Sequence, residues 1–286
     1  MDQFVKKIVG CLITVLLLCG CKRHFDNAAF VSDFCTRTAL PAYSVLNERV
    51  ALLHREAQQL GQQYNESQLI ATQIAWQQAM DALQYCKSFD VIESENFAQL
   101  EQKMVSFEKK IFDRQKGNAA LLPPPSTDPP ADFTQSIVEK AAALHTAWKN
   151  KEKQLATDKE AQQTVVRQLV AQLQALSGQM CSRNPGTVYA TDYAHHCIRH
   201  NLEGIRQVFG QGSFKGDVYN YVLFQQQDEI AEDILLQFDK TEFALENLQN
   251  TPLNDRPGYR RKDKRLFETS CQRLDSLLRA GFKEKE

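Results

Sequence analysis

The sequence predicts an all-α protein made of two antiparallel helix bundles. Apolar residues recur at alternating steps of three and four along most of the chain, which is the spacing of one face of an α-helix. No long segment alternates apolar and polar residues in the manner of a half-buried strand. Residues 119–130, AALLPPPSTDPP, hold five of the nine prolines, and such a segment is expected to be an extended connector between two groups of helices.

The first 20 residues have the order of a secretory signal peptide. Two lysines precede an apolar run at 8–20, which is shorter than the roughly 20 residues that a helix needs to cross a bilayer. Residues 18–21, Leu-Cys-Gly-Cys, resemble the lipobox of bacterial lipoproteins, so Cys21 is the expected lipid-bearing N-terminus. Cys11 and Cys19 remain alternative sites of modification, because Ala, Ser or Thr is more usual at the position of Cys19. A buried N-terminal helix is the alternative interpretation of the whole segment.

A lipid on Cys21 would place the protein in a particular compartment and attach it to a membrane. Acyl chains contribute about 0.8 kcal/mol per buried CH₂ and would hold a soluble domain, residues 21–286, on a membrane surface. By resemblance to enterobacterial lipoproteins, Lys22 after Cys21 favours the outer membrane, facing the periplasm. The formal net charge of −1 creates no field that would attract nucleic acid, which we therefore exclude as a partner.

The N-terminal half, residues 21–118, is predicted to contain three helices, each with one apolar stripe. The first helix ends near Gly61. Trp76 lies on the second stripe and is predicted to be a packing anchor rather than a ring that stacks on a ligand. The three stripes are Leu46-Val50-Leu53-Ala57-Leu60, Leu69-Thr72-Trp76-Met80-Leu83 and Phe97-Leu100-Met104-Phe107-Ile111.

The C-terminal half, residues 131–286, is predicted to contain five helices. A loop at 181–193 precedes the third of them, and the glycine-containing segment GQGSFKGD at 210–217 precedes the fourth. Because no strand is expected beside it, this second segment is predicted to be a loop rather than a phosphate-binding turn. The stripes are Phe133-Ile137-Ala141-Leu144-Trp148, Val165-Leu169-Leu173-Leu176-Met180, Ile198-Leu202-Ile205-Phe209, Ile234-Phe238-Leu245-Leu248 and Phe267-Cys271-Leu274-Leu278.

The cysteines after Cys21 could form disulfides, because the periplasm is oxidising. A hairpin that turns near residues 60–61 would bring Cys35 beside Cys86, so we expect this bridge first. A second expected pair, Cys181 and Cys197, flanks one loop. The remaining cysteine, Cys271, lies on an apolar stripe and is predicted to be a buried thiol.

One histidine cluster could bind a metal ion. The segment HHCIRH at 195–200 places His196 and His200 four residues apart on one helix face, so both imidazoles could reach the same ion. A third ligand would have to come from another helix, and no acidic partner is identifiable by spacing. The alternative is that these are polar histidines at the start of a helix.

A basic segment, RPGYRRKDKR at 256–265, could dock anionic headgroups or an acidic partner. The alternative is a solvated loop that runs into the last helix. Sequence motifs for dinucleotide binding, phosphate-binding loops, zinc peptidases and serine hydrolases are missing, so the common enzyme mechanisms have no support here.

Three segments resemble the imelysin-like family of bacterial envelope proteins. ESQLIATQIAWQQAMDALQYCKSFDV at 66–91 is similar to a family helix that carries a Trp. YATDYAHHCIRHNLEGIRQVFGQG at 189–212 is similar to a later helix with an Asn-x-x-Gly-Ile core. Residues 250–282 are similar to the family's closing loop and last helix. The resemblance identifies Trp76, Asn201 and Gly204 as family-motif or cleft residues.

This resemblance implies a two-bundle helical fold, an envelope location and a role in iron or haem acquisition. Some members are described as metallopeptidases with a Gly-x-His-x-x-Glu motif ahead of the connector. Here Glu108 stands in place of the His and Ile111 in place of the Glu, so peptidase activity is not implied. The leading hypothesis is a non-catalytic lipoprotein that binds iron, haem, zinc or an envelope partner. A divergent metallopeptidase using His196 and His200, and a structural envelope tether, are the alternatives.

Overall fold

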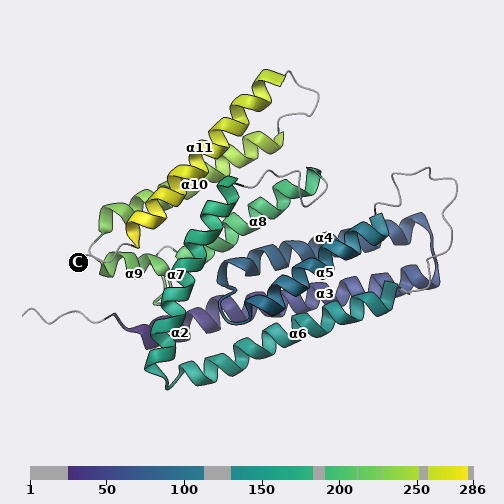
Figure 1. Cartoon of the computed structure of the whole chain (residues 1–286), viewed down its shortest axis with the longest axis horizontal. Coiled ribbons are helices and arrows are strands. Elements are labelled where there is room, and N and C mark those ends of the chain that lie inside the picture. Colours follow the sequence, from purple (N-terminus) through teal and green to yellow (C-terminus); the bar gives the residue numbers. More distant parts are fainter. Residues whose placement is uncertain are drawn as a thin grey trace, which may run out of the picture.

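The computed structural model describes residues 25–112, 130–182, 191–210, 212–225, 227–250 and 257–282. Within these ranges the chain is helical and contains no strand, which confirms the all-α prediction. The predicted signal peptide at 1–20, Cys21 and the proline-rich segment at 119–130, apart from Pro130, lie outside the described residues. Figure 1 shows two groups of long helices that meet along α7 and α8.

The first bundle contains α3 (Leu40–Gln62), α4 (Glu66–Cys86), α5 (Ser94–Phe112) and α6 (Pro130–Leu155). The helices α4 and α6 pack along α3, and α5 packs on α4 and α6. Before α3 come the short helix α2 (Asn27–Phe34) and a π-helix at Cys35–Ala39, which continues directly into α3. After α4 a 3₁₀ turn, η2 (Lys87–Phe89), reverses the chain toward α5.

The second group contains α7 (Lys159–Ser182), α8 (Thr191–Phe209), α9 (Val218–Phe224), α10 (Asp228–Asn250) and α11 (Pro257–Gly281). The long helices α10 and α11 form an antiparallel pair, and α11 also packs on α7. The helix α8 contacts α7 and α10 within its own group. It also packs on α4 and η2 of the first bundle, so α8 is the main bridge between the two groups.

The helix α6 belongs to the first bundle, although the sequence division placed it in the C-terminal half. Its apolar stripe is buried against α3, with the Trp148 ring 5.9 Å from Phe34 and 6.1 Å from Tyr43 between ring centroids. The change of packing partners therefore comes at the turn after α6, residues 156–158, rather than at 119–130. Residues 119–130 link α5 and α6, two helices of one bundle.

The predicted apolar stripes are buried throughout the part of the chain for which side chains are described, with Phe133 half-buried. Two short helices were missed. Helix α2 is capped by Asp26, whose carboxylate accepts a hydrogen bond from the Ala29 amide at 3.0 Å, and α9 follows the predicted loop at 210–217. Gly210 and Gly212 in that loop have φ of 71° and 77°, which an L side chain would adopt only with strain.

The expected Cys35–Cys86 disulfide is wrong, because both residues are free, buried thiols. Burial raises the pKa of the Tyr43 phenol, and Cys86 adds to this effect, so Cys86 lies near Tyr43 in the hairpin. Cys35 precedes Tyr43 by two helical turns, which is about 12 Å at 1.5 Å per residue and too far for a bridge. Burial, and secondarily Glu152, raises the pKa of Cys35 to about 12.

The other cysteine predictions have different outcomes. Cys271 is buried on the stripe of α11, as predicted. Cys197 is also buried, but the side chain of Cys181 lies outside the described part of the chain, so the pairing of these two residues stays a prediction. Among the described helices, none is both long and apolar enough to span a bilayer.

Candidate functional site

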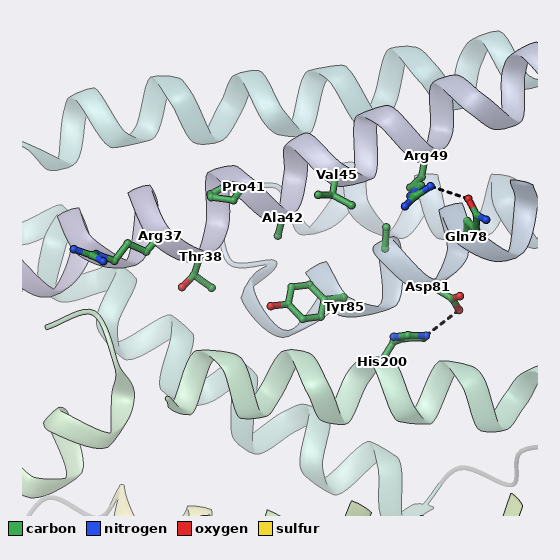
Figure 2. A pocket seen from close by; sticks show the side chains of 11 residues that line it. Arg37, Thr38, Pro41, Ala42, Val45, Arg49, Gln78, Asp81, Tyr85 and His200 are labelled. Atoms are coloured by element: carbon green, nitrogen blue, oxygen red, sulfur yellow. Dashed lines mark hydrogen bonds and ion pairs between the residues drawn. The ribbon is translucent and has the colours of Figure 1, made fainter. Parts of the chain in front are cut away.

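A groove of about 540 Å³ lies between α3 and α4 of the first bundle, beside α8 of the second group. The π-helix and α3 form one wall, α4 forms the other, and α8 closes the end where His200 lies (Figure 2). Apolar side chains cover much of the surface. They are Pro41, Ala42 and Val45 from α3 and Ala82 from α4.

Two arginines and one carboxylate, Asp81, line this groove. On α3, the Arg49 guanidinium donates a hydrogen bond of 2.8 Å to the Gln78 side-chain oxygen, which holds it over the groove (Figure 2). The Arg37 guanidinium pairs with Asp33 at 2.6 Å and lies 4.4 Å from the centre of the Phe214 ring. A ligand in the groove would therefore meet an apolar surface with a cation from Arg49 and another from Arg37.

The end of the groove at α8 is built around His200, which contacts two carboxylates. Its Nε2 lies 3.3 Å from Asp81 Oδ1 on α4, and its Nδ1 lies 2.7 Å from Glu203 Oε2 one turn further along α8. Burial alone would lower the pKa of His200. The hydrogen bonds and charges of the two carboxylates outweigh burial and raise this pKa to about 9.

His196 completes a cluster with these groups. It lies on α8 one turn before His200, and one ligand atom from each of Asp81, His196 and His200 lies within 4.8 Å of the others. The structure therefore brings together the two histidines that the sequence selected and adds Asp81 from another helix. Two imidazoles and one carboxylate are a donor set that could hold a divalent transition metal. The side chain of the neighbouring His195 lies outside the described part.

The sequence could have indicated one of the two acidic partners. Glu203 follows His200 by three residues, a spacing at which side chains on one helix meet, so the expectation of no acidic partner by spacing was wrong. Asp81 had no such signal, because its proximity to His200 depends on how α4 and α8 pack.

The match to a family model covers residues 107–280, more than half of the chain, and this model describes imelysin, peptidase M75. The chain belongs to the imelysin family. Its fold is also similar to the crystal structure of a proposed iron-regulated protein A precursor from Parabacteroides distasonis ATCC 8503, with a TM-score of 0.62 and 11% identity. That similarity covers 92% of this chain and 97% of the other. No curated protein matches the chain.

Asn201 and Gly204, which the resemblance selected from sequence, hold α8 against the first bundle. The buried Asn201 donates from Nδ2 to Gln84 Oε1 at 3.1 Å. A Cβ on Gly204 would overlap the Ser88 hydroxyl and the Tyr85 carbonyl, so only glycine permits this approach. Trp76, the third residue that the resemblance selected, is buried inside the first bundle and donates from Nε1 to the Met104 carbonyl at 2.9 Å.

Two further segments of this imelysin were named from sequence. Glu108, which the sequence analysis expected in place of the histidine of the family's metal motif, lies half-buried on α5. In the basic segment at 256–265, α11 begins at Pro257, so most of this segment is helix rather than the loop considered above. Lys262, Lys264 and Arg265 are exposed on α11, whereas the side chains of Arg260 and Arg261 lie outside the described part.

Proposed function

We propose that this imelysin-family protein is a lipid-anchored protein of the bacterial envelope that binds an anionic, iron-bearing ligand in the groove between α3 and α4, without catalysing a reaction. Family membership and the similar protein described as iron-regulated support the iron link. The lipobox-like residues 18–21 support the anchor at the outer membrane, facing the periplasm.

The observation that carries the binding function is the combination of an apolar groove with guanidinium groups. Arg49 and Arg37 present planar cations that suit carboxylates, and the apolar residues between α3 and α4 suit a hydrocarbon body. A volume of about 540 Å³ is in the range of small-ligand sites. Haem combines both features, because its porphyrin is apolar and its propionates are anionic. A carboxylate chelate of ferric iron offers the anionic groups alone.

The absence of catalysis is supported by the altered family motif. With Glu108 in place of the histidine and Ile111 in place of the glutamate, this position lacks the imidazole that would bind a catalytic zinc ion. A chain that has this fold and this groove but not the metal motif can still bind a ligand in the groove.

Ligand titration tests the binding proposal. We expect haem or ferric citrate to bind the purified chain, and Arg49→Ala to weaken that binding about tenfold or more, since a charge-assisted hydrogen bond contributes about 1.5–3 kcal/mol. The exposed Arg167 on α7 provides the matched control, because Arg167→Ala removes an equal charge away from the groove. Failure of the wild-type protein to bind either ligand would reject the proposal.

A second candidate function is favoured by the cluster of Asp81, His196 and His200. These three residues could support a divergent metallopeptidase. That activity requires cleavage of casein or insulin that stops with a chelator and is lost in His196→Ala. Cleavage that survives either treatment would exclude this mechanism.

A further inference from the structure

Two helices from different bundles bring three metal-binding side chains to one point. His196 and His200 are one turn apart on α8, and Asp81 faces them from α4. Bonds of about 2.1 Å from zinc to nitrogen or oxygen place neighbouring ligand atoms about 3.4 Å apart in a tetrahedral site. The distance from His200 Nε2 to Asp81 Oδ1 is already 3.3 Å, and a ring nitrogen of His196 lies within 4.8 Å of the ligand atoms of both residues.

The other nitrogen of His200 is arranged as it is in metal-binding histidines. Its Nδ1 lies 2.7 Å from Glu203 Oε2, so a neutral imidazole would donate its Nδ1–H to Glu203 and direct the Nε2 lone pair toward Asp81. Ligating histidines almost always have such an acceptor on their second nitrogen, because it fixes the ring and makes the ligating nitrogen more basic. Glu203 is not one of the three clustered residues, so its contact with His200 is a separate observation.

From this geometry we propose that Asp81, His196 and His200 bind one divalent transition metal ion, which links α4 of the first bundle to α8 of the second. Glu203 is a positioning residue that orients His200. Two imidazoles with one carboxylate favour Zn²⁺ or Fe²⁺ over Mg²⁺ or Ca²⁺, which prefer oxygen ligands alone. This inference goes beyond the groove proposal, because it needs no ligand in the groove.

The ion would remain accessible. Asp81 and His200 both line the groove, and His196 is exposed, so three protein ligands would leave further coordination positions open toward solvent. A closed structural zinc site would have four protein ligands. We therefore expect an exchangeable ion that a groove ligand could also contact.

Calorimetric titration of the tag-free full chain in detergent with Zn²⁺, and with Fe²⁺ under anaerobic conditions, tests this site. We expect one ion per chain and a rise of Tm on binding. His196→Ala should weaken Zn²⁺ binding at least tenfold and remove the rise of Tm. Because His196 is exposed, its loss should leave the metal-free fold intact.

The matched control is His145→Ala, which removes a histidine of α6 and should leave the Zn²⁺ affinity unchanged. Equal affinity in wild type and His196→Ala would overturn the proposal, as would loss of binding in His145→Ala. After either result, the contacts of His200 with Asp81 and Glu203 would be interpreted as ion pairs without a metal ion.

The role of Glu203 has a separate readout. Glu203→Gln should weaken Zn²⁺ binding about tenfold to a hundredfold and alter the visible spectrum of the Co²⁺ form, while Tm of the metal-free protein stays near wild type. An unchanged spectrum and affinity would remove Glu203 from the site. The metal titrations use protein free of haem and of iron chelates, so they test the metal site alone. The haem and citrate titrations use protein treated with a chelator, so they test the groove alone, and either proposal can fail without the other.

Discussion

At the scale of single residues, the buried carboxyl group of Asp90 is the clearest source of pH dependence. Asp90 lies after η2, is 8% exposed, and its Oδ1 lacks a hydrogen-bond partner in the described structure. Burial raises its pKa to about 7. This value is the net result, because Lys87 lowers the pKa while Glu101 and Glu93 raise it. The Lys87 ammonium is already held by both oxygens of Glu101 at 2.8 Å, which limits how far it can stabilise Asp90.

We predict that the chain loses stability as pH rises from about 4 to about 7. The folded state keeps the Asp90 proton up to about pH 7, whereas an Asp in the unfolded chain releases it near pH 4. The stabilisation that comes from this tighter proton binding is therefore complete below pH 4 and lost above pH 7. Asp90→Asn stays neutral. It should raise the free energy of unfolding on the order of 3 kcal/mol at pH 8 and have little effect at pH 4.

Urea unfolding of both proteins at the two pH values measures this difference. Asp233→Asn, on the exposed face of α10, serves as the control. A gain of equal size at both pH values would show that Asp90 is not the titrating group.

At the scale of elements, the contact between α4 and α8 matters most, because it positions both the groove and the metal ligands. Gly204 permits it, since any larger side chain would press against the Tyr85 carbonyl and Ser88. The Asn201–Gln84 hydrogen bond adds a polar link between the same two helices. A small shift of α8 relative to α4 should therefore change the distance between Asp81 and His200.

Gly204→Ala is predicted to lower the free energy of unfolding by about 1–3 kcal/mol, because the new methyl group meets backbone that cannot rotate away. It should also weaken Zn²⁺ binding by separating α8 from α4. Gly178→Ala on α7 is the matched control, since its methyl would lie 3.3 Å from the mobile end of Arg279. That variant should change stability by less than about 1 kcal/mol. Equal effects of the two substitutions in urea unfolding would contradict this account of the α4–α8 contact.

At the scale of the whole molecule, the proposed attachment to the membrane would decide where the groove works. We predict that Cys21 carries the lipid, so labelled palmitate should enter the wild-type protein and be lost in Cys21→Ser. Globomycin should cause an unprocessed precursor to accumulate, because it blocks cleavage before the lipid-bearing cysteine. A protein that remains unlabelled and cytosolic would reject the anchor. Retained labelling in Cys21→Ser would instead point to Cys11 or Cys19.

The sequence by itself determined the helices and which face of each is buried, since the 3.6-residue apolar period is a local property. Stripes such as Leu46–Leu60 and Val165–Met180 are buried as predicted, and the His196–His200 spacing follows from one helix alone. Family membership was also readable from short segments.

Only the tertiary structure decided how these helices pair. It placed α6 in the first bundle, separated Cys35 from Cys86, and brought Asp81 to His200. Each of these outcomes depends on the register and crossing of helices distant in the chain. An apolar stripe specifies that a face is buried, but many partner helices can bury it equally well.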